Sequence, residues 1–249
     1  MMKNVKWSAV FGRYVQLLVK VSLLVGCGTW LGNPPDKEGD GPKKNQLESE
    51  AVTLIFTALE ERTFDVTDRN GNVIAQVTLQ ENRHVLKDVY LYADTKPSEP
   101  AFQGPYVLDL LTGEVTPKPQ SKDLQVGVYK TASITGHVLQ AGEIPGLEED
   151  DPLIGKTSII RGQLKIGSLQ QPFEFAFDWN DELVVNDSGK DGGPSEVVAG
   201  LSNELVIAID YSKWFQVDSL TDLADGKKMG RHLVNSLKNN TSFRIERAE

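Results

Sequence analysis

The feature that most constrains the fold is a repeated pattern of short runs in which β-branched and aromatic residues alternate with polar ones. Such period-two alternation gives a strand one apolar and one polar face. Gly, Pro, Asn and Asp separate the runs, and these residues favour turns. The predicted strands lie at 51–58, 64–79, 85–94, 105–111, 125–138, 157–167, 172–179 and 204–212. The pattern predicts an all-β fold, either an antiparallel β-sandwich or a barrel.

Two of these runs carry more detailed information. Residues 64–79 form two runs that meet at Asn70-Gly71, a dipeptide that suits a type I′ hairpin because both residues tolerate positive φ. In the run 172–179, Phe173, Phe175 and Phe177 share one side and alternate with polar or small residues. This second run is predicted to be a half-buried strand.

The C-terminal part departs from the β pattern. Residues 212–215 are predicted to form a short helical turn capped by Asp210 or Ser212. Residues 229–240 space their apolar side chains for one face of a helix, and 241–246 follow as an edge strand. An edge of this kind could accept a strand from another subunit. The expected fold is therefore a β-sandwich with a short C-terminal helix and edge strand.

The N-terminal segment has the order of a secretory signal, because the basic residues Lys3, Lys6 and Arg13 precede an apolar stretch that ends in small residues. The string Leu24-Val25-Gly26-Cys27 resembles the bacterial lipobox. That resemblance implies cleavage before Cys27 and attachment of diacylglycerol to its thiol. Residues 1–26 are then a signal peptide, 27–50 a flexible tether rich in Pro, Gly and charge, and 51–249 the β-sandwich domain.

Two alternatives for the N-terminus are an uncleaved transmembrane anchor and a buried amphipathic helix. Lys20 interrupts the apolar stretch. A charge at the centre of a span costs roughly 2.5–3.5 kcal/mol, which disfavours the anchor. Attached acyl chains would instead hold the protein on a bilayer. Gly28, rather than Asp, follows the cysteine, so the predicted location is the outer membrane of the cell envelope.

The charge of the chain limits its partners. The 26 basic residues include four in the predicted signal peptide, which leaves 22 basic against 35 acidic residues and a net charge near −13. A surface of this sign repels phosphate, which argues against nucleic acid as a partner and against charge-driven docking on anionic lipid. The single cysteine excludes an intramolecular disulfide and a cysteine-rich metal site.

The middle of the chain resembles a family of uncharacterised bacterial lipoproteins with a transthyretin-like (prealbumin-like) sandwich domain. The matching strings are GPYVLDLLTGEV (104–115), LQVGVYKTASI (124–134), GQLKI (162–166), PFEFAFD (172–178) and ELVIAIDYSKWF (204–215). Members of the family carry Pro or Ala before the Gly of the second string, where this chain has Gln125-Val126. The resemblance implies a sandwich fold and transfers no catalytic residue.

No familiar catalytic grouping is present in the sequence. A zinc or copper site needs converging histidines, whereas His84, His137 and His232 lie on different predicted elements and are expected at surfaces or strand edges. No nucleophile elbow, phosphate loop or dinucleotide-binding fingerprint occurs. Serine hydrolase, kinase and dehydrogenase chemistry therefore lack a starting residue.

Calcium is the ion that the sequence favours most, because hard oxygen ligands on flexible loops suit Ca²⁺. The candidate ligands are Asp65, Asp68, Asn70 and Asn72. Further acidic groups occur at 148–151 and 186–191. The spacing does not match an EF-hand, and ordinary turn formation also explains Asp68 and Asn70.

These observations order three hypotheses. The first is a non-enzymatic, membrane-anchored envelope lipoprotein whose β-sandwich has a structural role or binds a protein or glycan partner through its loops. The second is a calcium-binding envelope domain, with no other cofactor expected. The third is an envelope hydrolase, which would need two carboxylates facing each other across a cleft.

The first hypothesis depends on Cys27, and mass spectrometry of the native protein tests it directly. We expect the mature chain to begin at Cys27 and to carry the mass of attached acyl chains. An unmodified thiol, or an intact leader, would remove the basis for an envelope location.

Overall fold

The computed structural model describes residues 48–57, 59, 61–187 and 194–248. The predicted signal peptide, Cys27 and almost all of the predicted tether lie outside the described residues. The first strand, β1 (Ser49–Thr57), begins two residues before the predicted domain boundary. Among the described residues, no helix is both long enough and apolar enough to cross a membrane.

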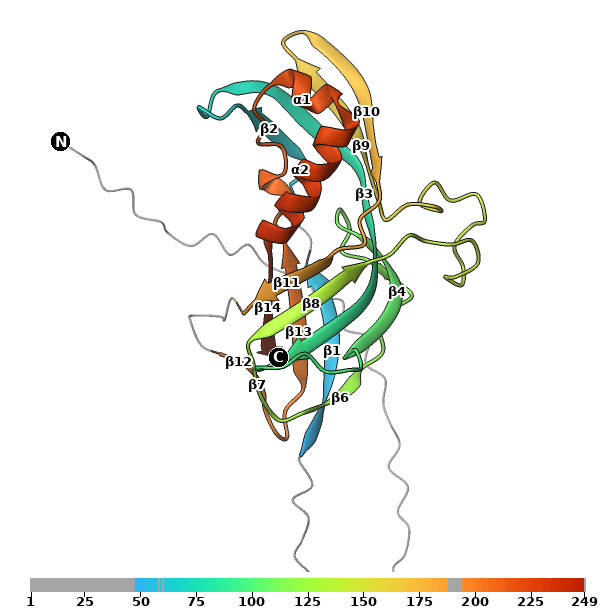
Figure 1. Ribbon diagram of the computed structural model, residues 1–249, viewed down its shortest axis with the longest axis vertical. Helices are drawn as coiled ribbons and strands as arrows, with labels where there is room; N and C mark the ends of the chain where they lie inside the picture. The colour runs from blue at the N-terminus through green and yellow to red at the C-terminus, as the bar shows by residue number, and fades with distance from the viewer. Residues whose placement is uncertain (1–47, 58, 60, 188–193, 249) are drawn as a thin grey trace, which may run out of the picture. The chain divides into compact units, whose positions relative to one another are not determined.

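The fold is an all-β sandwich of mainly antiparallel sheets with a short C-terminal helix, as the sequence predicts, although β1 and β13 run parallel to each other (Figure 1). One sheet has the order β14-β13-β1-β6, and the larger one runs β10-β9-β3-β4-β5 with β2, β8 and β11 attached. A third pairing joins β12 to β7. The further strands are β2 (Thr63–Thr67), β3 (Val73–Tyr92), β4 (Phe102–Asp109), β5 (Val115–Thr116), β6 (Lys122–Gln125), β7 (Gly127–Tyr129), β8 (Thr131–Gly136), β9 (Ser158–Ile166), β10 (Leu169–Phe177), β11 (Glu182–Asn186), β12 (Ser195–Val197), β13 (Asn203–Ile209) and β14 (Thr241–Arg247).

Strand β3 is the central strand of the larger sheet. Its 20 residues pair with four strands, β2, β4, β8 and β9. The sequence predicts two separate strands here, ending at 79 and beginning at 85, because the residues between them are polar. The structure corrects this prediction, since the strand continues through Gln80–His84. Two register shifts, one between Leu79 and Glu81 and one between Leu86 and Val89, accompany the change of partner. Each shift reverses which residues face the core.

The core is shared by the two main sheets, which defines the sandwich. Apolar side chains from β1 and β13, such as Leu54 and Ile207, belong to the same buried cluster as Leu86 and Val89 of β3. A second, smaller cluster contains Val85 of β3 and lies under the long connection between β8 and β9. Leu139 and Leu153 of that connection belong to the same cluster. The middle of β3 is therefore covered on both faces.

The C-terminal elements follow the sequence prediction closely. The turn η2 (Tyr211–Lys213) is capped by the side chain of Asp210. Helices α1 (Leu220–Ala224) and α2 (Gly226–Asn239) come next, and Asp225 caps α2 by accepting hydrogen bonds from two backbone N–H groups. Strand β14 is terminal in its sheet, as expected, although Asp187 forms a bridge with its Phe243.

The hairpin between β2 and β3 forms, but its turn differs from the predicted type I′ turn. Gly71 N–H donates to the carbonyl of Asp68 at 2.9 Å, which makes Arg69 and Asn70 the central residues. Gly71 itself has a φ of 82° and follows the turn. This is the longer hairpin loop in which the glycine takes the left-handed position after the turn.

Candidate functional site

The polar run in the middle of β3 organises the site. Within Glu81–His84, successive side chains point to opposite faces of the sheet, as strand geometry requires. Glu81 and Arg83 lie on the face covered by the β8–β9 connection, whereas Asn82 and His84 point into the main core, where they are 0% and 1% exposed. Each face provides its own network of polar partners.

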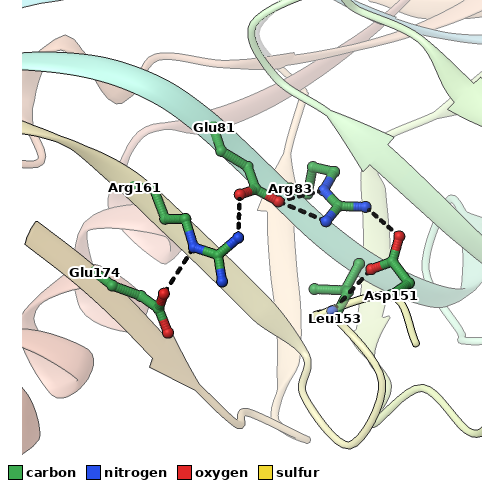
Figure 2. A network of polar contacts seen from close by, with 6 residues as sticks. All are labelled: Glu81, Arg83, Asp151, Leu153, Arg161 and Glu174. Atoms are coloured by element: carbon green, nitrogen blue, oxygen red, sulfur yellow. Dashed lines mark hydrogen bonds and ion pairs between the residues drawn. The ribbon is translucent and has the colours of Figure 1, made fainter.

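On the first face, five charged side chains form a ladder across three strands and one loop (Figure 2). Glu174 of β10 accepts from Arg161 of β9 at 2.7 Å, and Arg161 also donates to Glu81 at 2.9 Å. Arg83 then bonds to Glu81 at 2.7 Å and to Asp151 at 2.8 Å. Positive and negative groups alternate along the ladder, so no like charges are adjacent. It ties β10 to the β8–β9 connection.

The inner end of the ladder is poorly exposed, with side-chain exposures of 18% for Arg83 and 12% for Asp151. Burial alone would raise the pKa of the Asp151 carboxyl, but hydrogen bonds from Arg83 and from the Leu153 backbone lower that pKa below its usual value. Burial likewise opposes the charge of Arg83, and its bonds to Asp151 and Glu81 outweigh burial and raise its pKa. Both groups are therefore held in their charged forms.

On the second face, four buried side chains form a chain of hydrogen bonds. The indole N–H of Trp179 donates to Ser158 Oγ at 2.9 Å, Ser158 Oγ lies 2.7 Å from His84 Nδ1, and His84 Nε2 lies 2.8 Å from Asn82 Oδ1. Burial lowers the pKa of His84 to about 3, so the ring is neutral. The hydrogen bonds of this chain are mutually consistent if Ser158 donates to Nδ1 of His84 and the Nε2–H of His84 donates to Asn82.

This arrangement also corrects the expectation that His84 lies at a surface or strand edge. Serine, histidine and asparagine in contact are the residue types of a nucleophilic triad. Here, however, Ser158 and Asn82 are 0% exposed, and the histidine ring is in edge contact with buried Trp214. A substrate cannot reach the Ser158 hydroxyl, so the trio acts in packing.

A surface groove of about 1350 Å³ lies between β10 and α2. One wall is the continuous segment 174–181, which comprises the end of β10 and the loop to β11; the other includes Lys227, Gly230, Arg231 and Val234. Successive strand residues face opposite sides of a sheet. A groove lined by consecutive residues 174–177 therefore follows the edge of β10.

Both polar networks end at this groove. Glu174, the outer end of the charged ladder, lines the groove, and so does Trp179, the first donor of the buried chain. The indole packs tightly over β8, because a Cβ added at Gly136 would lie 2.5 Å from Trp179 Cε3. On the other wall, a Cβ at Gly230 would lie 3.4 Å from Phe177 Cβ, so the helix approaches the strand closely there. Tight packing therefore holds both walls of the groove in place.

The two walls of the groove differ in charge. Lys227 and Arg231 are exposed on α2 and, in the described residues, form no salt bridge. Of the carboxylates on the opposite wall, Glu174 is paired with Arg161 and Asp181 with Lys238, whereas Asp178 is in no salt bridge within the described residues. The α2 wall thus presents two cations, Lys227 and Arg231, beside the helix-capping carboxylate of Asp225.

The four predicted calcium ligands do not share one cavity. Asp65 contacts Gln76 at 3.3 Å and lines one surface depression, while Asp68 lines another. The Asp68 carboxylate accepts hydrogen bonds from the backbone of Asn70 and from the backbone and side chain of Asn72. These bonds, the side-chain bond from Asn72 foremost, lower the pKa of Asp68. Turn formation therefore accounts for Asp68, Asn70 and Asn72.

The other predicted metal candidates are also dispersed. Asp151 belongs to the charged ladder, Asp187 accepts from Ser195, and Asp191 lies outside the described residues. His137 contacts Glu143, and His232 contacts the backbone of Trp214. Within residues 48–248, as far as they are described, no three His, Cys, Asp or Glu side chains are grouped to hold a metal.

The calcium hypothesis makes a direct prediction about stability. If Asp65 and Asp68 bind Ca²⁺ in the folded state, millimolar calcium should raise the melting temperature relative to EDTA. An Asp68→Asn variant should lose that rise. Equal melting temperatures in calcium and in EDTA would exclude the hypothesis.

Comparisons of the chain with protein-family models, with curated proteins and with solved structures find no match. The resemblance to transthyretin-like lipoproteins therefore stays a prediction.

The sequence predicted the aromatic strand and the helix that form the groove, but it did not bring them together. Phe173, Phe175 and Phe177 are partly buried and share one face, as predicted. The missed signal was the segment 80–84, a polar run between two strand-like runs. Read as the middle of one strand, it would have predicted polar partners on both faces.

The charged ladder predicts a pH-dependent contribution to stability. Asp151→Asn should lower the free energy of unfolding at pH 7 by about 1–3 kcal/mol, because Arg83 loses a charged partner in a poorly exposed site. The pKa of Asp151 is lower in the folded than in the unfolded state. Its contribution is therefore complete well above the unfolded-state pKa of 3.8 and is lost as the pH falls through the lower folded-state pKa.

Urea unfolding of both proteins at several pH values measures this difference. Asp94→Asn is the matched control, because Asp94 pairs with Lys130 but is 84% exposed, and exposed pairs contribute little. A deficit for Asp151→Asn that stays constant from neutral to acid pH would contradict the assignment.

Proposed function

We propose that this chain is a lipid-anchored envelope protein, held in the outer membrane through Cys27, whose β-sandwich binds a protein partner without catalysing a reaction. The observation that carries the binding role is the groove between β10 and α2, about 1350 Å³ in volume, in which Lys227 and Arg231 form no salt bridge within the described residues. The anchor rests on the lipobox-like sequence at Cys27. A tether of about twenty residues would let the domain reach a partner away from the bilayer.

The construction of the groove supports recognition. Glu174 and Trp179 are each held by a network that reaches back to β3, so the strand wall changes little when a partner binds. Preorganisation of this kind reduces the entropy lost on association. The sequence placed recognition in the end loops of the sandwich, whereas this groove runs along a strand and a helix.

The chemistry of the groove favours binding over hydrolysis. Glycoside hydrolysis needs one carboxyl to donate a proton and a second to attack or to activate water. Four carboxylates line the groove. Glu174 and Asp181 are engaged in salt bridges and Asp225 caps α2, which leaves Asp178 without such a partner within the described residues. One carboxylate without a structural partner does not provide the pair that this reaction needs.

A protein partner fits the groove better than a glycan does. Trp179 is only 4% exposed, and Phe175 and Phe177 are partly buried against the core, so the aromatic rings offer no open platform for a sugar face. The groove is instead bordered by the adjoining helix wall and by the outer edge of β10, which pairs with no further strand in the described residues. Nucleic acid is disfavoured by the acidity of the chain.

Selection of random linear peptides displayed on phage, against the full-length protein in detergent, tests the proposal. We expect enriched peptides to bind the wild-type protein and to bind Asn235→Trp at least about tenfold more weakly, since Asn235 lines the groove and the indole would fill it. Asn239→Trp is the matched control, because Asn239 is exposed on the next turn of α2 and does not line the groove.

Equal binding by the two tryptophan variants would place the peptides elsewhere and contradict the proposal. Failure to enrich any peptide would contradict it as well. The melting temperature of each variant shows whether the fold is intact.

A further inference from the structure

The edge of β10 that lines the groove has a defined pattern of free backbone groups. β10 is the terminal strand of its sheet and, among the described strands, pairs only with β9. A two-residue turn, Gly167-Ser168, joins the two strands, and Ile166 faces Leu169. In such a hairpin the pair that flanks the turn exchanges both backbone hydrogen bonds, and every second pair after it does the same.

This register decides which residues of β10 point their backbone groups away from β9. Residues 171, 173, 175 and 177 bond to β9, so Gln170, Pro172, Glu174 and Ala176 point outward. Pro172 supports the assignment, because proline lacks an N–H and is found in strands where that group would face an open edge. Of the outward set, Glu174 and Ala176 line the groove. In the described residues, no turn or cap hydrogen bond uses their backbone groups.

We infer that the groove binds an extended, acidic peptide segment as an additional strand on the edge of β10. This inference rests on the proposed function and specifies how the protein partner binds. The backbone N–H and C=O groups of Glu174 and Ala176 pair with the segment, which is the general mechanism of strand addition. The extended segment lies between β10 and α2.

The charge of the segment follows from the α2 wall. Lys227 and Arg231 are four residues apart and therefore lie on the same side of the helix. Both line the groove, and neither is in a salt bridge within the described residues. Carboxylates on the helix-facing side of the added strand would pair with them. A second copy of the chain is the alternative occupant, and sedimentation of the protein distinguishes it below.

The backbone part of the inference is tested with a peptide enriched by the selection above, synthesised with one N-methyl group at successive positions. Strand addition predicts that methylation weakens binding at every second residue by about fivefold to tenfold, since only alternate N–H groups face β10. Uniform sensitivity, or sensitivity with a helical period, would overturn the inference. Because the peptide would still bind in the groove, the proposed function would survive that result.

Two substitutions in the protein provide the matched test. Ala176→Pro removes an outward N–H inside the groove and should weaken binding by a similar factor. Gln170→Pro removes an outward N–H outside the groove and should leave binding unchanged, with melting temperatures confirming that both variants fold. Equal binding by the two proline variants would overturn strand addition.

Charge and stoichiometry complete the experiment. The double variant Lys227→Glu, Arg231→Glu should bind the peptide more weakly, and the wild-type affinity should fall as salt is raised. If the enriched peptides carry no acidic residues, or the charge reversal has no effect, the acidic assignment is wrong. Sedimentation of the full-length protein alone that shows a dimer dissociated by Ala176→Pro would identify a second copy as the occupant and overturn the inference.

Discussion

The structure depends on one constraint, which is that the polar residues in the middle of β3 must find partners on both faces of a buried strand. An unsatisfied buried polar group costs about 1–3 kcal/mol, and an uncompensated buried charge costs more. Glu81 and Arg83 meet this requirement through a ladder of ion pairs. In the core, His84 is bonded through both ring nitrogens and Asn82 through Oδ1, whereas Asn82 Nδ2 has no hydrogen-bond partner in the described residues. The partners come from β9, β10 and the two connections that flank them. The bonds to the polar side chains of β3 therefore fix the positions of these segments.

The two register shifts in β3 allow its polar residues to form one network on each face of the sheet. Before Gln80 the odd-numbered residues face the main core, as Val77 and Leu79 do; after it the even-numbered ones do. Without the shift at Gln80, Glu81 and Arg83 would point into the main core and His84 would face the loop side. The second shift, near Lys87, returns Val89 and Leu91 to the core. The two register shifts thus confine the inward-facing polar residues of β3 to the stretch between Gln80 and Lys87.

How much was predictable depends on the range of the interactions. The alternation of Phe173, Phe175 and Phe177, the cap at Asp210 and the apolar face of α2 are local patterns, and the sequence predicted them. The continuity of β3 was missed because the run 80–84 has the composition of a loop, and its partners Asp151, Ser158 and Arg161 are distant in sequence. His84 was wrongly assigned to the surface for the same reason. The groove combines β10 with α2, about fifty residues later in the chain, so only the fold could reveal it.

The edge of β10 is protected in two different ways, and the difference bears on selectivity. Open edges invite unwanted pairing between chains. Near the hairpin turn Pro172 removes an outward N–H, which blocks a continuous ladder. Over Glu174 to Phe177 the protection comes instead from α2, which approaches the strand at Phe177 and leaves a slot beside it. Under the strand-addition proposal, this groove takes up one extended chain beside the helix. The position of α2, and not the sequence of β10, would therefore determine whether this edge pairs with a binding partner or with the sheet of another molecule.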